Sequence, residues 1–310
     1  MSKTISSIVP APLKQGDSIA VVATARFVDI KVLAFAEQLF NSWGLKPKRA
    51  ANLLKQEFNF AGSDLERKSD LQWAFDDRSI KAIFCFRGGY GSVRILEDLG
   101  NANLKKNPKW IIGFSDVTAL HNYMNSQCSI ASLHATMPIN YKENTTNALH
   151  SLKEFLFNKK INYSFDANSN NKLGNCVAPI VGGNLAILQS LLGTKYDIST
   201  KGKILFLEEV DEYLYNIDRM LWTLKLSGKL AQLSGLIIGG FTALKDNETP
   251  FGLSVEEMIL EKVQEYNYPV CFDFPAGHFD NNCALPLGLN VELSVQKEKV
   301  SISSQSSNLI

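Results

Sequence analysis

The sequence WIIGFSDVTALH, residues 110–121, predicts a strand, a tight turn and the start of a helix. Residues 110–112 are apolar, Gly113 permits the turn, and helical spacing of apolar residues begins at Val117. A serine at such a turn can project its hydroxyl from the sheet, beside the unpaired backbone N–H groups of the helix start. Ser115 is therefore a candidate nucleophile, although this stretch alone favours the commoner role of Ser115 or Asp116 as a helix N-cap.

The preceding residues repeat this alternation of strands and helices. Buried strands are predicted at residues 18–23 and 81–86, and helices at residues 29–43 and 63–75. Ser63 and Glu66 have the spacing of a capping box at the start of the second of these helices. Alternation to about residue 155 predicts an α/β domain with a doubly wound parallel sheet, in which ligands bind at the carboxyl ends of the strands.

A glycine-rich turn, RGGYGS at residues 87–92, follows the predicted strand at 81–86. Its glycines allow backbone N–H groups to approach a ligand closely. The turn lacks the glycine spacing of nucleotide-binding loops, so a phosphate site is the weaker interpretation. Both this turn and Ser115 follow predicted strands, and we expect them at the same edge of the sheet.

Composition and charge favour a globular protein that binds small molecules. Its 310 residues, 45% of them hydrophobic, suffice for one large or two medium domains. The 32 basic and 31 acidic side chains give a net charge of +1, which provides no attraction to nucleic acid or to an anionic membrane. Five scattered cysteines predict buried thiols in a reducing compartment, and without a leader or membrane span we expect a cytoplasmic protein. No cluster has metal-ligand spacing, so no cofactor is expected.

Residues 140–175 contain few apolar residues and predict a linker region. We expect an N-terminal domain at residues 1–160, a linker at 161–176 and a C-terminal domain at 177–310. The final forty residues, with ALPLG at 284–288, are expected to form strands that close the second domain. The other elements predicted there are strands at residues 177–180, 204–207, 235–240 and 269–272 and helices at 217–226 and 255–263.

Three polar residues, Ser115, Glu208 and His278, each follow a predicted buried strand. A serine hydroxyl needs a base to become a nucleophile, and an imidazole base needs an acceptor that fixes its tautomer. These three side chains can supply the three roles. Each also has a structural interpretation, because a strand-end carboxylate often caps a turn and a lone histidine is more often a hydrogen-bonded structural residue.

Other residues compete for two of these roles. Glu209 is a rival for the acid, and spacing alone does not separate it from its neighbour. His121 and His134 are rivals for the base. His121 follows Ser115 by roughly 9 Å of helix rise and is not expected to reach it.

Seven short motifs are spread over nearly the whole chain. They are RGGYG at 87–91, GFSD at 113–116, GGN at 182–184, LEEV at 207–210, IDR at 217–219, GH at 277–278 and LPLG at 285–288. Together they resemble the LD-carboxypeptidases, also called muramoyltetrapeptide carboxypeptidases. The resemblance implies a serine peptidase with a flavodoxin-like N-terminal domain and a smaller β-rich α/β C-terminal domain, usually as a homodimer.

The resemblance also implies a role for each site residue. Ser115 is the nucleophile, His278 the base and Glu208 the orienting carboxylate. The oxyanion hole is expected from the backbone N–H of Asp116 and from an N–H of the Gly88–Gly89 turn.

The implied substrate is the murein tetrapeptide, which is cut to a tripeptide and D-alanine during peptidoglycan recycling. The microcin-immunity branch of the family, which hydrolyses peptidyl or aminoacyl nucleotide analogues, would need an exposed aromatic ring, and Trp222 in a helical core pattern is a poor candidate. An α/β-hydrolase esterase would have glycine where Val117 stands. A flavodoxin-like protein that binds a small ligand is the non-enzyme alternative.

Overall fold

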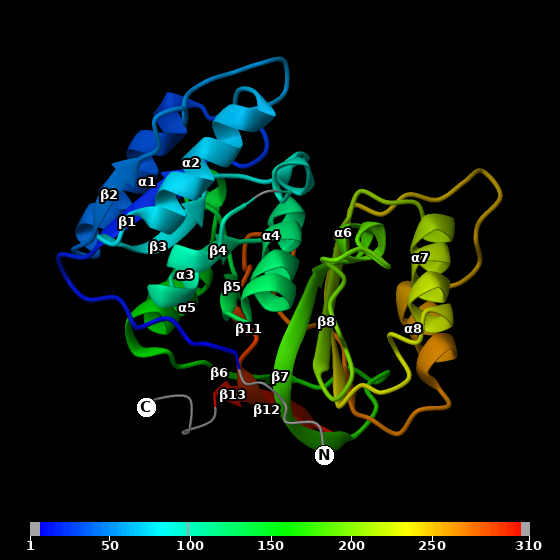
Figure 1. The fold of residues 1–310 in the computed structure, drawn as a ribbon. Coiled ribbons are helices and arrows are strands. Elements are labelled where there is room, and N and C mark those ends of the chain that lie inside the picture. The colour runs from blue at the N-terminus through cyan, green and yellow to red at the C-terminus, as the bar shows by residue number, and fades with distance from the viewer. Residues whose placement is uncertain (1–6, 98, 305–310) are drawn as a thin grey trace.

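The computed structural model describes residues 7–97 and 99–304, and it contains two β-sheets with helices packed on them (Figure 1). The first sheet has the order β2-β1-β3-β4-β5-β11, and all neighbours except β5 and β11 are parallel. This order confirms the predicted α/β class with a flavodoxin-like, doubly wound sheet. Its strands are β1 (Ser18–Val22), β2 (Lys46–Arg49), β3 (Ile80–Cys85), β4 (Trp110–Gly113), β5 (Ser132–His134) and β11 (Leu285–Leu287).

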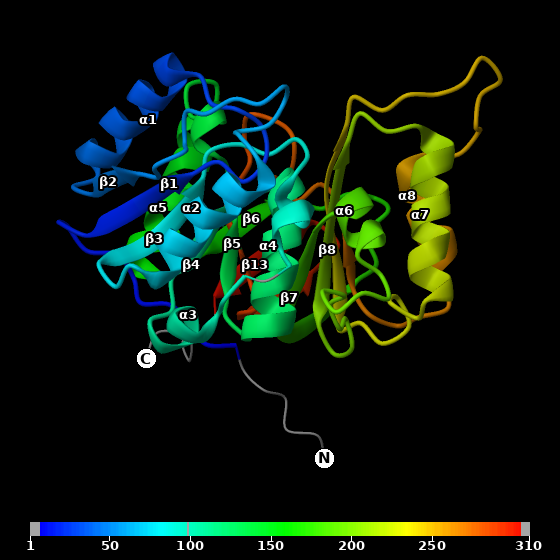
Figure 2. The ribbon, with the colours of Figure 1, turned by 45° about the horizontal axis from the view of Figure 1, so that its top comes forward.

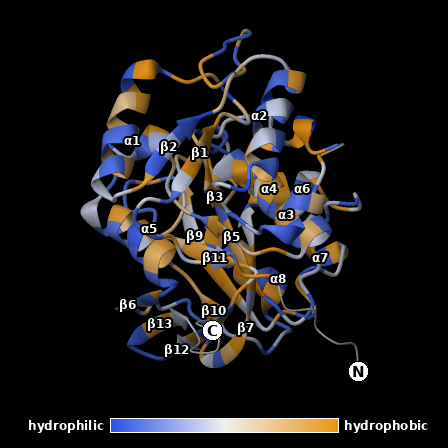
Figure 3. Cartoon of the chain, turned by 60° about the vertical axis from the view of Figure 1, so that its left-hand side comes forward, coloured by the Kyte–Doolittle hydropathy of each residue, from blue (hydrophilic) through white to orange (hydrophobic). Residues whose placement is uncertain are grey.

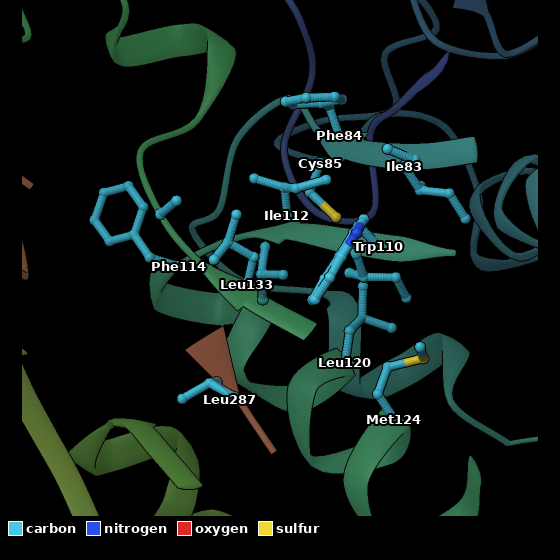
Figure 4. Close-up of a cluster of buried hydrophobic side chains, with 14 of the residues drawn as sticks. Ile83, Phe84, Cys85, Trp110, Ile112, Phe114, Leu120, Met124, Leu133 and Leu287 are labelled. Carbon is cyan, nitrogen blue, oxygen red and sulfur yellow. The ribbon is translucent and has the colours of Figure 1, made fainter. Parts of the chain in front are cut away.

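Helices cover both faces of the first sheet: α1 and α5 lie on one side, and α2, α3 and α4 on the other (Figure 3). Their bounds are α1 (Ile30–Ser42), α2 (Asp64–Asp76), α3 (Ala102–Lys106), α4 (Thr118–Tyr123) and α5 (Thr146–Asn158). Phe84 of β3 packs on Phe40 of α1, and Trp110 of β4 packs on Phe155 of α5, with ring centroids 4.5 and 5.1 Å apart. Figure 4 shows buried side chains of β3, β4 and β5 together with Leu120 of α4, the helix on the face of the sheet opposite to α1 and α5.

Helix starts follow the predicted caps. The Ser63 hydroxyl accepts a hydrogen bond from the N–H of Glu66, and the Glu66 carboxylate accepts one from the N–H of Ser63, so the predicted capping box is confirmed. Ser254, the residue before the predicted helix at 255–263, accepts a hydrogen bond from the N–H of Glu257 at the start of α8 (Val255–Val263). Local sequence therefore determines where these helices begin.

The second sheet has the order β10-β9-β8-β7-β12-β13-β6. Neighbours from β10 to β7 are parallel, and those from β7 to β6 are antiparallel. Helices α7 and α8 cover the face of the parallel half that is turned away from the first sheet (Figures 1 and 2). The elements are β6 (Asn162–Asp166), β7 (Gly174–Asn184), α6 (Leu185–Ser190), β8 (Ile204–Val210), α7 (Leu214–Leu226), β9 (Gly235–Thr242), β10 (Val270–Cys271), β12 (Asn290–Val295) and β13 (Lys299–Ser304).

One strand belongs to a different sheet from the one predicted. The expectation that residues 284–288 help to close the second domain is wrong, because β11 pairs antiparallel with β5 of the first sheet, with Leu285 opposite His134. Pro286 has no N–H to donate, and β11 lies at the edge of the sheet, where proline is tolerated. The apolar pattern of this segment predicts a buried strand but does not identify its partner.

Residues 140–175 contain more regular structure than a linker. They include α5, which buries Leu152 and Phe155 and exposes its polar face to solvent. An amphipathic helix of this kind contains few apolar residues, and its sequence therefore resembles that of a linker. They also include β6, which lies within the expected linker 161–176 and pairs with β13. The division of the chain into two domains stays a prediction.

All five cysteines are free thiols, and all except Cys176 are buried, which agrees with the prediction of buried thiols. Within the residues that the structure describes, no helix combines the length and the apolar composition needed to cross a bilayer. The compartment stays a prediction.

Candidate active site

Ser115 lies at the turn between β4 and α4, as the sequence predicts. Its φ of +61° is a left-handed conformation that costs a non-glycine residue about 1 kcal/mol or more. A one-turn 3₁₀ helix, Ser115–Val117, leads into α4, and Phe114 occupies its N-cap position without a side-chain hydrogen bond. The alternative in which Ser115 or Asp116 caps this helix is therefore wrong. A strained turn with a partly exposed serine has the geometry of a nucleophile elbow.

The side chain of Asp116 joins this turn to the glycine-rich turn. Its buried carboxylate accepts hydrogen bonds from the N–H groups of Ser92 and Gly91, at 2.9 and 3.3 Å. Burial raises the pKa of the Asp116 carboxyl above its usual value, although these hydrogen bonds oppose the change. The sequence gives no signal for this contact, since it predicts Asp116 only as a possible helix N-cap and as a donor through its backbone N–H.

Gly88 lies directly against Ser115. A Cβ on Gly88 would lie 3.4 Å from both Ser115 Oγ and Asp116 N, so these atoms border a space that glycine leaves open. Gly89 has a φ of +115° and faces the other way, because a Cβ there would meet the Arg26 side chain at 2.5 Å. The turn thus contacts Ser115 at one residue and Arg26 at the next. The oxyanion hole at Asp116, Gly88 and Gly89 stays a prediction.

His278 and Glu208 form a hydrogen-bonded pair, with 2.7 Å between Nδ1 and Oε2. Glu208 lies inside β8 rather than after it and is fully buried, whereas the His278 side chain is 20% exposed in the loop between β10 and β11. Burial lowers the pKa of His278, but the charge and hydrogen bond of Glu208, together with a smaller effect of the Glu209 charge, raise it, and the net pKa is above the usual value. The His278 ring also packs on Phe114, at 4.8 Å between centroids, which brings it beside the residue that precedes Ser115.

The two neighbouring glutamates have different partners. Glu209 accepts hydrogen bonds from Asn184 Nδ2 and from the N–H groups of Ala186 and Val210, at 2.8 to 2.9 Å. Its carboxylate therefore stabilises the start of α6 and does not contact His278. Successive side chains of a strand point to opposite faces of the sheet, which explains why these adjacent glutamates have different surroundings.

The rival histidines are buried away from a carboxylate. His121 Nε2 lies 2.9 Å from the carbonyl oxygen of Gly113, and its Nδ1 lies 2.9 Å from Ser132 Oγ. Burial lowers the pKa of His121 to about 4. His134 is fully buried between the Phe114 and Phe206 rings, and burial lowers its pKa well below the usual value. Neither environment favours a general base at neutral pH.

Two side chains that hold the His278 loop were not predicted. Asn282 Oδ1 accepts a hydrogen bond from the N–H of Gly277 at 3.0 Å, and Thr242 Oγ1 donates to the carbonyl oxygen of His278 at 3.2 Å. Isolated polar residues such as these two carry no sequence signal.

A cavity of about 600 Å³ lies beside the His278 loop. It is lined in part by Thr242 and Phe279 and is large enough for a small ligand.

The GGN motif explains how the two sheets approach each other. Gly182 and Gly183 lie inside β7, which continues beyond the strand predicted at 177–180. A Cβ on Gly183 would lie 2.5 Å from Thr118 Oγ1 of α4, and the Asn184 N–H donates to that same hydroxyl at 3.0 Å. Figures 1 and 2 both place α4 beside β7 and α6. The motif therefore holds the helix after Ser115 against the second sheet.

Trp222 is not a core residue of α7, contrary to its predicted position. It is 37% exposed, whereas the helix buries Ile217, Met220, Leu221 and Leu224. The ammonium groups of Lys225 and Lys262 lie 5.6 and 5.0 Å from the indole centroid. The exposure removes the reason for rejecting this ring, so that its being a poor platform for a nucleotide base stays a prediction.

Among the described residues, no group of three or more His, Cys, Asp or Glu side chains is arranged to hold a metal ion. That the reaction needs no cofactor stays a prediction.

Comparisons with known proteins identify a family for this chain. Models of the LD-carboxypeptidase N-terminal and C-terminal domains match residues 19–135 and 177–293. A probable murein peptide carboxypeptidase of Bacillus subtilis (strain 168) is 31% identical over 93% of this chain and 92% of its own length. The crystal structure of muramoyltetrapeptide carboxypeptidase from Oxalobacter formigenes has a TM-score of 0.85 at 26% identity, covering 92% of this chain and 98% of that one. MccF in complex with glutamyl sulfamoyl guanosine has the same TM-score of 0.85 at 21% identity, over 96% and 98% of the two chains, and is similar in fold alone.

Proposed function

The chain belongs to the LD-carboxypeptidase family of serine peptidases, and on that basis we propose that it removes the terminal D-alanine from murein tetrapeptides. The observation that carries the proposal is the 2.7 Å contact between His278 and Glu208, two residues 70 positions apart in the chain. The left-handed turn at Ser115 and the packing of Phe114 on His278 support the same assignment. We assign Ser115 as nucleophile, His278 as base and Glu208 as the carboxylate that orients His278.

In this mechanism the Nδ1–H of His278 donates to Glu208, so the Nε2 atom is free to take the proton of Ser115. The serine oxygen attacks the carbonyl carbon between an L-configured centre and the D-residue. The N–H groups of Asp116 and of the Gly88–Gly89 turn would stabilise the oxyanion. His278 then protonates the leaving amine of D-alanine, and with its help water hydrolyses the acyl-enzyme.

We place this reaction in peptidoglycan recycling in the cytoplasm. The five free thiols, four of them buried, support a reducing compartment. The names of the murein peptide and muramoyltetrapeptide carboxypeptidases described above support a peptide substrate. A homodimer follows only from the family resemblance and stays a prediction.

The direct test is to supply purified protein with murein tetrapeptides and with an aminoacyl sulfamoyl nucleotide. We expect release of D-alanine and tripeptide from the tetrapeptides, and tetrapeptides that differ at the third residue would show whether diaminopimelate or lysine is preferred. Faster hydrolysis of the nucleotide analogue would instead support a microcin-immunity role. Failure to release D-alanine would contradict the proposal.

The pH dependence should report the His278–Glu208 pair. Only neutral His278 can act as base, and Glu208 raises the pKa of His278 above its usual 6.5 despite the opposing effect of burial. We therefore expect kcat/KM to fall as pH decreases, with the midpoint of this acidic limb above pH 6.5. The raised pKa also makes the free energy of unfolding depend on pH. The pair of charged His278 and Glu208 stabilises the fold fully below the pKa that His278 has in the unfolded chain, and this contribution is lost as pH rises through the pKa of His278 in the folded protein. An acidic limb centred below pH 6.5 would contradict the assignment.

A further inference from the structure

A carboxypeptidase must recognise a free carboxylate next to the bond that it cuts. In the proposed substrate this carboxylate belongs to the D-residue, one residue beyond the scissile carbonyl. One residue spans at most about 3.6 Å, so the receptor must lie within about one residue and one hydrogen bond of the oxyanion hole. Arginine suits this task, because its planar guanidinium binds a carboxylate through two parallel hydrogen bonds.

Arg26 lies against the glycine-rich turn, at the residue that follows the contact with Ser115. Gly88 borders Ser115 Oγ, and the next residue, Gly89, is covered by the side chain of Arg26. A Cβ on Gly89 would lie 2.5 Å from Arg26 Cδ and 2.6 Å from Arg26 Nε. The glycine therefore allows the arginine to lie directly on the backbone of the turn, one residue from the contact with the candidate nucleophile.

Arg87 precedes the same glycines and lies close to Arg26. Its Nη1 donates to the carbonyl oxygen of Phe27 at 3.4 Å, and its guanidinium lies 6.0 Å from the centroid of the Phe27 ring. Burial lowers the pKa of Arg87, and the positive charge of Arg26 lowers it further. Arg87 therefore contacts the residue that follows Arg26, and the two cations are neighbours along this edge of the sheet.

These two arginines have no acidic partner of their own. Within residues 7–97 and 99–304, neither guanidinium forms an ion pair, and the buried Nε of Arg26 has no hydrogen-bond partner. Three other arginines around the first sheet pair with carboxylates, namely Arg49 with Glu37 and both Arg67 and Arg94 with Asp64. Arg78 also has no ion pair among the described residues, but it is exposed to solvent, unlike Arg26 and Arg87. Two neighbouring, partly buried cations that have no carboxylate partner in the protein favour the binding of an anionic group from a ligand.

The position in the sheet agrees with a ligand site. Arg26 follows β1 and Arg87 follows β3, and the strand order reverses between these two neighbouring strands. In doubly wound sheets, ligands bind at the carboxyl ends of the strands at this switch point.

We propose that Arg26 and Arg87 form the subsite that binds the terminal carboxylate of the leaving D-residue. This inference rests on the proposed function and adds to it the reason why the enzyme removes a single terminal residue. A substrate that continues past the D-residue, or that ends in an amide, lacks the anion which these two cations need.

The test compares a tetrapeptide that ends in free D-alanine with the same peptide ending in D-alaninamide. Wild-type protein should cleave the acid with a kcat/KM at least about tenfold higher than the amide. Arg26→Gln and Arg87→Gln should each lower kcat/KM for the acid by about 10- to 100-fold and leave the amide within about threefold of wild type. Arg87→Lys keeps the charge without the planar fork and should lose less.

Arg49→Gln is the matched control, since it removes an arginine that is ion-paired with Glu37 on the surface of the same domain, and it should change neither rate. Binding of both peptides to Ser115→Ala protein measures the same discrimination without turnover, and thermal unfolding shows whether each variant is folded. Equal losses on acid and amide, or a wild type that does not distinguish them, would overturn the subsite. A wild type that releases no D-alanine at all would instead refute the proposed function.

Discussion

Ser115→Ala is expected to lower kcat for D-alanine release from a murein tetrapeptide by at least about a thousandfold, because the acyl-enzyme cannot form without the hydroxyl. Substrate binding and the oxyanion donors would leave only the residual catalysis typical of a triad enzyme that lacks its nucleophile. The measurement is D-alanine release by purified protein, with the melting temperature as a check on folding. A fluorophosphonate should label the wild type at Ser115 and leave the variant unlabelled.

Ser129 supplies a control with the same backbone conformation. Its φ is +55°, against +61° for Ser115, and it follows the π-helical segment Met124–Cys128. Ser129→Ala therefore makes the same chemical change at a left-handed residue outside the proposed machinery, and we expect a rate within about twofold of wild type. If Ser115→Ala kept more than about a thousandth of the wild-type rate while Ser129→Ala behaved as expected, another residue would have to be the nucleophile.

Most elements of the first sheet and its helices follow from interactions that are local in sequence. The 3.6-residue period of α1 and the capping box at Ser63 act over a few residues, and the strand-turn-helix pattern at Ser115 does the same. Strand partners depend instead on contacts that are distant in sequence. Leu285 and Leu287 fit the interior of either sheet, and only the path of the chain decides that β11 joins β5. Helix α5 was missed because its exposed face is polar.

The candidate site was predictable in its residue types and less so in its geometry. Ser115 and His278 could be singled out because each follows a buried segment, but their acid partner could not be chosen from spacing. Both faces of β8 are buried, so the usual alternation of polar and apolar residues does not reveal which glutamate faces His278. The Arg26 contact with Gly89 also joins residues far apart in sequence, and no motif connects them.

Glu208→Gln is expected to lower kcat/KM by about a thousandfold to ten-thousandfold, as replacement of a triad carboxylate by an amide does elsewhere. The glutamine can occupy the same space, but it does not stabilise the imidazolium that forms at His278, and its amide N–H can select the wrong tautomer. Without the carboxylate, burial dominates the pKa of His278, so the acidic limb of residual activity should move to lower pH.

Glu209→Gln is the matched control, because the adjacent residue carries the same side chain and is also buried, at 3% exposure. Both of its carboxylate oxygens accept hydrogen bonds, and an amide NH₂ in place of one oxygen would face a donor from Asn184, Val210 or Ala186. This mismatch should lower stability by about 1 to 3 kcal/mol, while kcat/KM stays within about tenfold of wild type. The two substitutions therefore separate catalysis from stability at neighbouring positions. If Glu209→Gln lost the activity and Glu208→Gln lost only stability, the orienting carboxylate would be Glu209. If both variants lost the same activity at the same stability, Glu208 could not be assigned this role alone.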